Sequence, residues 1–200
     1  MRISSLAPRF VGEFQKGIDY IGDARAFASG LEVHASLARL GRYRLSIHSG
    51  SDKYTVFPLI GQLTRGRFHI KTSGTSWLEA LRLMARDEPA LFRAYLSAAV
   101  ESFDAARRYY HVTPDLSRLP RIGELADAEL PALLDQIAAR QVLHISYGEV
   151  LKDSRTRGAI FSALEARAEA YHGMAAANIE RHLVALGVPK KEGSRPSFMS

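Results

Sequence analysis

The chain has 200 residues, 46% of them hydrophobic and 24% charged, which suits one ordinary core and predicts a single domain over residues 1–200. It contains no apolar run of the roughly 20 residues that a membrane-spanning helix needs, and no signal-peptide pattern, so we expect a cytoplasmic protein without membrane contact. Cysteine is absent, which excludes disulfides and thiolate metal sites and leaves His, Asp and Glu to hold any metal.

The formal net charge of +6 arises from 27 Lys and Arg residues against 21 Asp and Glu residues. This excess suits an anionic partner, either nucleic acid or an anionic metabolite. The basic residues are scattered, and no motif that combines aromatic and basic residues supports nucleic-acid binding. We therefore expect a small anionic ligand, no nucleic acid, and a flexible solvated tail over residues 188–200.

The first predicted element is a strand over residues 17–22, a short run of apolar, β-branched and aromatic residues that Gly22 closes. Asp23, a good helix N-cap, then opens a helix that Gly41 ends. Its apolar residues recur at helical spacing, so we expect a buried face formed by Phe27, Leu31, Ala35 and Ala38 and widened by Val33, Leu37 and Leu40.

Two further strand-and-helix units follow along the chain. Residues 42–49 and 67–72 are predicted strands, and residues 54–63 form a short helix between them. After the third strand, Ser76 with Glu79 three residues later has the form of a capping box, followed by a buried helix face of Trp77, Leu78, Leu81 and Met84. Three consecutive βα units over residues 10–88 predict an α/β fold with parallel strands, a partial TIM-barrel-like repeat.

Residues 89–187 are predicted to be mainly helical. Pro89 opens a helix, residues 114–120 form a connecting loop, and a short amphipathic helix includes Leu130, Leu133, Leu134 and Ile137. A long helix runs from Phe161 to Leu186. Residues 140–151 fit either a fourth strand or a helix, because periodicity cannot decide for so short a run, and we favour the helix.

Polar side chains recur on the predicted strands. Alternate residues of a strand share a face, which pairs Ser46 with His48 and His69 with Lys71. Ligands bind at the carboxyl ends of parallel strands in βα barrels and open α/β sheets. We therefore expect Asp19, His48 and Lys71 to converge, with His48 and Lys71 at one rim of the sheet facing a shared hollow that accepts an anion.

The two turns that follow the second and third strands are rich in small residues. Their backbone N–H groups can face an anion, whereas the structural alternative is that Gly50 and Gly74 only permit positive φ and that Ser and Thr cap helices. Two such turns in succession, each preceded by an ionisable strand residue, favour the functional interpretation.

For single residues, the structural alternatives stay open. His48 and His69 fit metal ligands or hydrogen-bonded structural histidines, and His144 lies in an apolar segment that suits either a core or a site. Lys71 in a buried strand would need a paired anion. The chain has no GxGxxG after its first predicted strand, no GxxxxGK[ST], no GxSxG and no HExxH, so signatures of nucleotide folds, esterases and zincins are missing.

Five segments carry a resemblance to a known family: GIDYIGD, LSIHSGSDKYTVFPLIG, GRFHIKTSGTSWLEALR, RYYHVTPDLS and RQVLHISYGEVL. Together they resemble the tagaturonate epimerases, bacterial enzymes of hexuronate breakdown. The resemblance implies interconversion of the anionic sugar acids tagaturonate and fructuronate, which differ in configuration at C4, with a divalent metal such as Zn, Mn, Ni or Co.

Family members are considerably longer, and their additional sequence precedes the part that matches SSLAPRF. The resemblance therefore implies the carboxyl-terminal part of an epimerase, either truncated or split. A homodimer or a partner subunit would then supply the missing upstream half. The alternative is a catalytically degenerate protein that binds a sugar acid without turning it over.

The resemblance also implies a chemistry. The C2 ketone does not acidify the C4 hydrogen, so we expect a retro-aldol route in which a metal polarises the ketone and a base takes the C4 hydroxyl proton. We assign His48 as a metal ligand, with Asp19 or His69, and Asp52 and Lys71 as catalytic residues. The substrate is expected to contact Ser49, Lys53, Thr72, Arg140 and His144, with Lys71 also available to its carboxylate.

Overall fold

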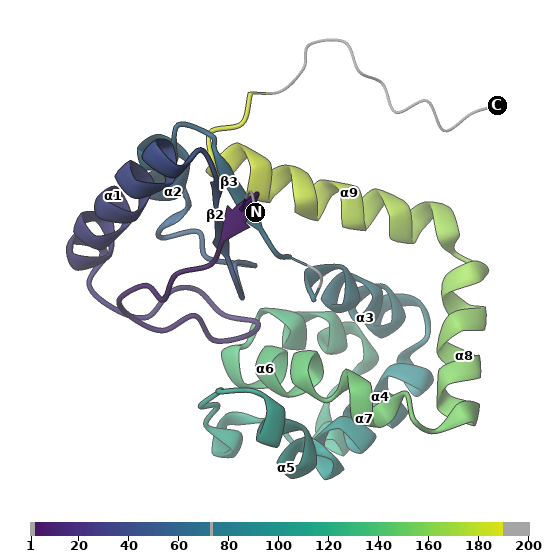
Figure 1. Cartoon of the computed structure of the whole chain (residues 1–200). Coiled ribbons are helices and arrows are strands. Elements are labelled where there is room, and N and C mark those ends of the chain that lie inside the picture. The colour runs from purple at the N-terminus through teal and green to yellow at the C-terminus, as the bar shows by residue number, and fades with distance from the viewer. Residues whose placement is uncertain (1–2, 73, 190–200) are drawn as a thin grey trace, which may run out of the picture.

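The computed structural model describes residues 3–72 and 74–189 and places a small parallel sheet beside a larger group of helices (Figure 1). The sheet has the order β1-β2-β3, with β1 at Ser5–Leu6, β2 at Arg44–Ile47 and β3 at Phe68–Ile70. Leu45 pairs with Phe68 and Ser46 with His69 in a parallel register. The prediction of an α/β protein with parallel strands is confirmed, although the described residues are mostly helical and the three strands do not continue into a barrel.

The predicted strand over residues 17–22 is wrong. These residues form turns, and the local pairing is an isolated antiparallel bridge between Glu13 and Ile21. Gly17 and Gly22 have φ of 75° and 149°, which an extended strand does not contain. The aromatic residue that suggested a strand, Tyr20, packs against Phe27 with ring centroids 5.3 Å apart. The first strand of the sheet is instead the exposed pair Ser5–Leu6, which has no strand-like periodicity.

Helix α1 (Ala24–Gly41) forms as predicted, because the Asp23 side chain accepts hydrogen bonds from the backbone N–H groups of Arg25 and Ala26. The predicted narrow face of Phe27, Leu31, Ala35 and Ala38 is buried. The expected widening is wrong, since Val33, Leu37 and Leu40 are 61%, 50% and 82% exposed. The helix packs on one side only, so a single stripe of its surface is covered.

Helices α2 (Phe57–Thr64) and α3 (Thr75–Asp87) follow β2 and β3. Leu78, Leu81 and Met84 are buried as predicted. The capping box is wrong: Gly74 is the N-cap of α3, no side chain caps the helix, and Ser76 already lies inside it. A Cβ built at Gly74 would lie 1.9 Å from Nε2 of His144, so a close approach of the two segments fixes where α3 begins.

The remaining described elements are helical, as predicted for residues 89–187. They are α4 (Pro89–Glu101), α5 (Phe103–Ala106), α6 (Ile137–Ile145), α7 (Tyr147–Val150), α8 (Ser154–Glu165), α9 (Ala168–Ala185) and the 3-10 segments Arg107–Tyr109, Leu116–Arg118, Ile122–Glu124 and Asp127–Asp135. The helical interpretation of residues 140–151 is confirmed. The single long helix is wrong, because it breaks after Glu165, and the predicted helix around Leu130 is a 3-10 segment that leaves Ile137 64% exposed.

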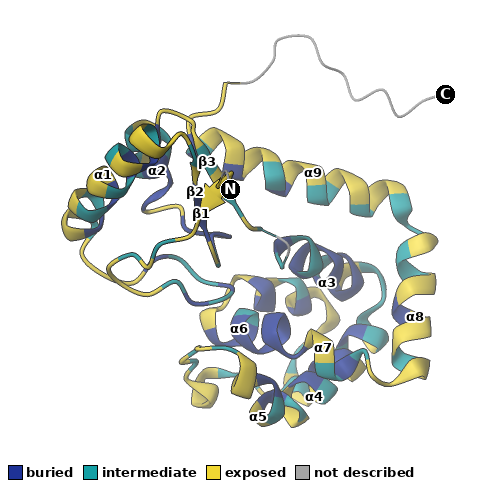
Figure 2. Ribbon diagram, in the orientation of Figure 1, coloured by how far each residue is buried: buried dark blue, intermediate teal, exposed yellow. Residues whose placement is uncertain are grey.

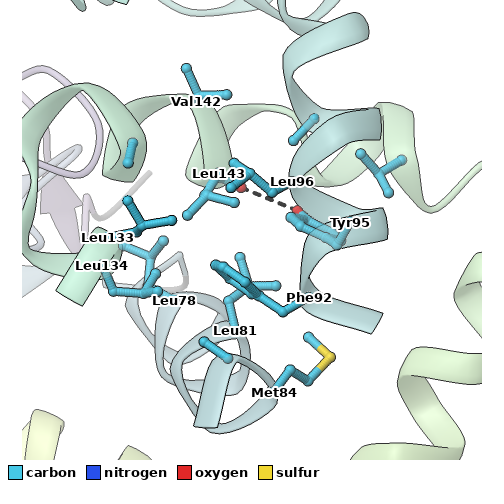
Figure 3. Packing of buried hydrophobic residues seen from close by; sticks show 14 of the residues in the cluster. Leu78, Leu81, Met84, Phe92, Tyr95, Leu96, Leu133, Leu134, Val142 and Leu143 are labelled. Carbon is cyan, nitrogen blue, oxygen red and sulfur yellow. Dashed lines mark hydrogen bonds between the residues drawn. The ribbon is translucent and has the colours of Figure 1, made fainter. Parts of the chain in front are cut away.

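Two hydrophobic clusters form the interior. The sheet core consists of Tyr20, Phe27, Leu31, Ala35, Ala38, Leu45, Ile47, Val56, Phe57, Ile60 and Leu186. The helical core is larger and includes Leu78, Leu81, Met84, Phe92, Tyr95, Leu96, Leu133, Leu134, Val142 and Leu143, drawn in Figure 3. Tyr95 is buried there because its hydroxyl donates to Leu143 O at 3.2 Å.

Buried residues line the inward faces of α3, α4 and α6, whereas α1 and α9 expose most of their surface (Figure 2). None of the described helices combines the length and the apolar content that crossing a bilayer requires. The predicted flexible tail over residues 188–200 lies almost wholly outside the described residues.

Candidate functional site

A set of buried polar residues links the sheet side of the molecule to the helical side. This polar seam consists of Gln15, Asp52, Lys53, Arg140, Gln141, His144 and His182. They come from the loop before α1, the turn between β2 and α2, helix α6 and helix α9. Because buried polar groups need partners, the hydrogen bonds of the seam fix how these four segments meet.

Lys53 is the most deeply buried charge of the seam, with no exposed surface. Its ammonium group donates to the carbonyl oxygens of Gln15, Ile18 and Ser51. Burial lowers the pKa of Lys53 to about 8, and the nearby carboxylates of Asp52 and Asp19 oppose that shift. Lys53 therefore holds the 15–18 loop against the 51–53 turn, and its ammonium is not open to the substrate contact expected for it.

Gln15 and Gln141 join the same loop to α6. The Gln141 side-chain amide donates to Gln15 Oε1 at 2.9 Å, and the backbone N–H of Thr113 donates to the same oxygen at 3.0 Å. Gln15 Nε2 donates in turn to Thr113 Oγ1 at 3.0 Å. The loop before α1 is thereby bonded to the helical side at Thr113 and at Gln141, which are 28 residues apart in the sequence.

Asp52 is held in an unusual conformation from two directions. Its φ is 59°, in the left-handed region, and its backbone N–H donates to Nε2 of His182 at 3.1 Å. Nε2 is thus an acceptor, so Nδ1 of His182 carries the proton and donates to Asn178 O at 2.8 Å. The carboxylate of Asp52 pairs with Arg140 at 3.0 Å. The carboxylate of Asp52 is thereby held in one orientation beside the guanidinium of Arg140, and both groups face the same part of the molecule.

That place is a cavity of about 360 Å³, here called the aspartate cavity, lined by Asp19, Asp52, Tyr54, Glu79, Arg140 and Arg181 among others. Arg140 is anchored by bonds to Gly17 O and Leu134 O, both 2.7 Å. Asp19 accepts from the backbone N–H and the hydroxyl of Thr55. The predicted residues Asp19, Asp52 and Arg140 are therefore brought together. Asp19 reaches this place from a turn, and not from the strand that was expected to carry it.

The largest of the described cavities, about 620 Å³, lies at the start of α3 and is here called the lysine cavity. The predicted Lys71 and His144 line it, together with Lys16, Gly74 and a wall of Trp77, Tyr110, Tyr147 and Tyr171. His144 is 5% exposed and its Nδ1 has no hydrogen-bond partner. Burial, and then the positive charges of Lys16, Arg140 and Lys53, lower the pKa of His144 to about 3, so its ring is neutral.

The expected shared hollow of His48 and Lys71 is not found. His48 and Ser49 line a third cavity of about 480 Å³ beside Glu13 and His111, whereas Lys71 lines the lysine cavity. The two strands end at Ile47 and Ile70, each two residues before its predicted end, and the turns after them lead the side chains apart. Lys71 is exposed, so the buried lysine that would have required a paired anion does not occur.

The other predicted site residues have local partners. His69 is exposed and its Nδ1 lies 3.0 Å from Ser46 Oγ. Thr72 accepts hydrogen bonds at its carbonyl from the backbone N–H and the hydroxyl of Thr75. The two glycines of the turns do not supply positive φ; the left-handed residues are Ser49 and Asp52, while a Cβ at Gly50 would lie 2.7 Å from Ile70.

The predicted metal ligands do not gather. His48, Asp19 and His69 lie at different places, and no group of three or more His, Asp or Glu able to hold a metal occurs among residues 3–72 and 74–189. The carboxylates of the aspartate cavity are instead matched by arginines, as in the pairs Arg140 with Asp52 and Arg82 with Asp135. The described residues therefore do not fit a complete metal centre.

Lys16 and His182 were missed by the sequence reasoning. Lys16 precedes an apolar run, and no local pattern shows that it turns toward α3. His182 lies on a mainly exposed helix, where histidine defaults to a surface role, yet it is 2% exposed. The one available signal is its helical spacing from Asn178, a second buried polar residue four positions earlier on α9.

Comparison with known proteins relates this chain to one family. A sequence model of the tagaturonate epimerases matches residues 1–186. A tagaturonate/fructuronate epimerase of Thermotoga maritima is 40% identical over 184 residues, covering 92% of this chain and 38% of that protein.

Crystal structures of the fructuronate-tagaturonate epimerase UxaE from Cohnella laeviribosi are also similar. The native form is 48% identical with a TM-score of 0.88, and a form with two glycerol molecules is 47% identical with a TM-score of 0.90. Each comparison covers 92% of this chain and 39% of that one. The chain thus spans about two-fifths of the length of the relatives that it matches, and it belongs to the tagaturonate epimerase family.

Proposed function

We propose that this chain forms part of an epimerase of ketohexuronates, which interconverts tagaturonate and fructuronate by inverting C4. The observation that carries the proposal is 48% identity with a TM-score of 0.88, over 92% of the chain, to an enzyme named for that interconversion. At this identity the two backbones agree over the matched part, and the site residues described above are our candidates for the chemistry.

The chain spans 39% of that enzyme, and we propose that it supplies one wall of the active site. The short strands β1 and β3 are the edges of the three-stranded sheet, and edge strands in proteins are usually paired or covered. We propose that these edges are covered in an assembly, either by a partner subunit that carries the rest of the epimerase sequence or by a second copy of this chain. Either assembly would extend the sheet toward a TIM barrel. A divalent metal would belong to that assembled enzyme, with donors from outside the described residues.

The proposed reaction is a retro-aldol cleavage followed by re-addition. A base takes the proton of the C4 hydroxyl, the O–H electrons form the C4 carbonyl, and the C3–C4 bond breaks to leave its electrons in an enediolate. Rotation of the aldehyde and reversal of these steps invert C4. Asp52 is the proposed base, because its carboxylate faces the aspartate cavity and is fixed by Arg140 and by the bond from its N–H to His182.

The test follows D-tagaturonate by NMR in the presence of the purified protein, alone and combined with the part of the Cohnella laeviribosi enzyme that this chain does not cover, with Zn²⁺, Mn²⁺, Ni²⁺ or Co²⁺ added in separate samples. Fructuronate should form, and a C4 deuterium label should be retained; washout of the label into solvent would favour direct deprotonation at carbon. Asp52→Asn should lower kcat by roughly 10²- to 10⁴-fold, the usual effect of a lost acid–base group. Lys152→Gln, at an exposed position on the helical side, is the matched control.

A second candidate function is a sugar-acid-binding protein without turnover. Two observations favour it: the chain covers only 39% of the enzyme, and its described residues assemble no group of three metal ligands. No conversion with any of the four metals, together with saturable binding of tagaturonate, would support the binder and contradict the epimerase.

A further inference from the structure

We propose that the lysine cavity binds the carboxylate of the sugar acid between Lys16 and Lys71, at the amino terminus of α3, with the carbon chain against the aromatic wall. The identity of the ligand rests on the proposed function. The evidence for an anion site is independent of it and comes from the charges, the helix end and the buried histidine of this cavity.

The two lysines bring uncompensated positive charge to one place. Neither makes an ion pair with a carboxylate in the described part of the chain, although both line the same cavity. Burial, and then the charge of Lys71, lower the pKa of the half-buried Lys16. Glu165, a carboxylate of the lining, is exposed on α8 and pairs with neither lysine. An anion between the lysines would relieve both their mutual repulsion and the desolvation of Lys16.

The helix end adds directed donors to this charge. α3 has 13 residues, begins at Thr75, and has no side chain capping its first turn. The N–H of Thr75 donates to Thr72 O, no side chain caps the N–H groups that follow, and the helix dipole places partial positive charge there. Gly74 and Ser76 of this turn belong to the lining of the cavity. Helix N-termini of this kind bind anions in many proteins.

His144 also lines this cavity and is 5% exposed. Its Nε2 lies at the start of α3, 1.9 Å from where a Cβ would stand at Gly74, whereas the unpartnered Nδ1 lies toward Gly17. Because the ring is neutral, it adds a donor or an acceptor without a third positive charge, which suits a hydroxyl or carbonyl oxygen beside the carboxylate.

The shape and the wall favour a sugar acid over a bare inorganic anion. A volume of about 620 Å³ lies in the range of small-molecule sites and far exceeds what phosphate fills. Trp77, Tyr110, Tyr147 and Tyr171 supply apolar ring surface, which suits the C–H groups of a sugar, and the tyrosine hydroxyls add polar tips, whereas the Trp77 N–H donates to Tyr95. The aspartate cavity, which Asp52 faces, borders the lysine cavity: Lys16 and Gly74 line the lysine cavity, and the next residues along the chain, Gly17 and Thr75, line the aspartate cavity. The carbon chain of a bound acid would therefore extend from the lysines toward Asp52.

The test measures binding by titration calorimetry with the full chain. The probes are D-fructuronate, its neutral counterpart D-fructose, and inorganic phosphate. Wild type should bind fructuronate at least about tenfold more tightly than fructose. Lys16→Gln should weaken fructuronate binding by roughly tenfold or more, and Lys71→Gln by about two- to fivefold, since the first group is partly desolvated and the second is exposed. Neither change should alter fructose binding.

Two further variants sharpen the result. Lys71→Glu, at an exposed position that tolerates the change, should weaken fructuronate binding more than Lys71→Gln. Arg25→Gln removes one positive charge at an exposed position of α1 that lines none of the cavities described above, and should leave binding unchanged. Circular dichroism of each variant checks that it is folded.

Each outcome separates this proposal from the proposed function. Unchanged fructuronate binding in folded Lys16→Gln and Lys71→Glu overturns the lysine cavity as the anion site, even if the protein epimerises tagaturonate. No measurable fructuronate binding to wild type, or phosphate binding as tight as that of fructuronate, overturns it too. Binding that depends on the lysines without any epimerisation supports the cavity and refutes the epimerase.

Discussion

The sheet core and the helical core are assembled in different ways. Most of the helical core comes from one stretch of chain, Leu78 to Ile160, and its helices pack directly on one another. The sheet core comes from residues 20–60 and is completed by Leu186, which α9 brings back from the far end of the described chain. Both cores are apolar clusters, whereas the polar seam between them buries Lys53, Gln141 and His182 to an exposure of 2% or less. The comparison indicates that apolar packing stabilises each core, while the hydrogen bonds of the polar seam determine how the two cores are positioned relative to each other.

The largest effect should follow from truncating either core. Phe27→Ala in the sheet core and Phe92→Ala in the helical core each remove a ring that is at most 1% exposed. Each should lower the free energy of unfolding by about 3–5 kcal/mol. Urea unfolding followed by near- and far-ultraviolet circular dichroism is the measurement, and one shared transition is expected for both variants because the seam couples the cores. Separate transitions for the two variants would show that the seam does not couple them.

Lys53→Met breaks the seam without touching either core. Three carbonyl oxygens lose their donor, so the free energy of unfolding should fall by about 2–4 kcal/mol, measured by urea titration beside Lys152→Met as control. The pKa of Lys53 is lower in the folded state, about 8, than in the unfolded chain. Above pH 8 the unfolded state holds the extra proton, so this group makes stability rise with pH there. A wild-type profile parallel to that of Lys53→Met would contradict this role.

These two effects also mark what the sequence could predict. Apolar periodicity is local, so it indicated α1 through Phe27 and Leu31 and the helix after Pro89. Strand pairing is not local: Ser5–Leu6 joins the sheet because β2 offers it an edge, and nothing in two exposed residues announces that. The false strand at 17–22 failed for the converse reason, because its aromatic content serves packing against α1.

The candidate site was predictable in its chemistry and only partly in its geometry. Strand alternation placed Lys71 within the third strand and in a hollow shared with His48, whereas it lies just past the end of β3 and lines a different cavity, because turn conformation decides where such side chains go. Asp52 is a case in point, since its positive φ depends on a hydrogen bond to His182, 130 residues away. Lys16 had no sequence signal, as its role depends on where α3 begins.

His144 allows a subtler test of the seam through pH. Its pKa is about 3 in the folded protein, below the ordinary value of 6.5. Between these values the unfolded chain is protonated and the folded protein is not, so stability should fall as pH drops below about 6.5, by up to about 1.4 kcal/mol per pH unit. His144→Asn should flatten this part of the curve, read as the difference between the two proteins at pH 7 and pH 5 by urea unfolding. Equal slopes would mean that His144 is not buried neutral.

The smallest effect is expected on the outer surface of α1. Leu40 is 82% exposed, so Leu40→Gln should change the free energy of unfolding by less than about 0.5 kcal/mol. Leu31→Gln, on the buried face of the same helix, is the contrasting variant and should be strongly destabilising. A loss of more than about 1 kcal/mol for Leu40→Gln would show that this face is covered in solution.

The bond from Asp52 to His182 has a consequence for the order in which the protein matures. During translation the sheet core can begin to collapse as soon as residues 20–60 have emerged, but the left-handed turn at Asp52 lacks its clamp until α9 has been made and has docked. Closing so long a loop costs more chain entropy than forming the local contacts of the sheet core. In a nascent chain the proposed base Asp52 is therefore not yet held in place, and its orientation becomes fixed only after α9 has docked.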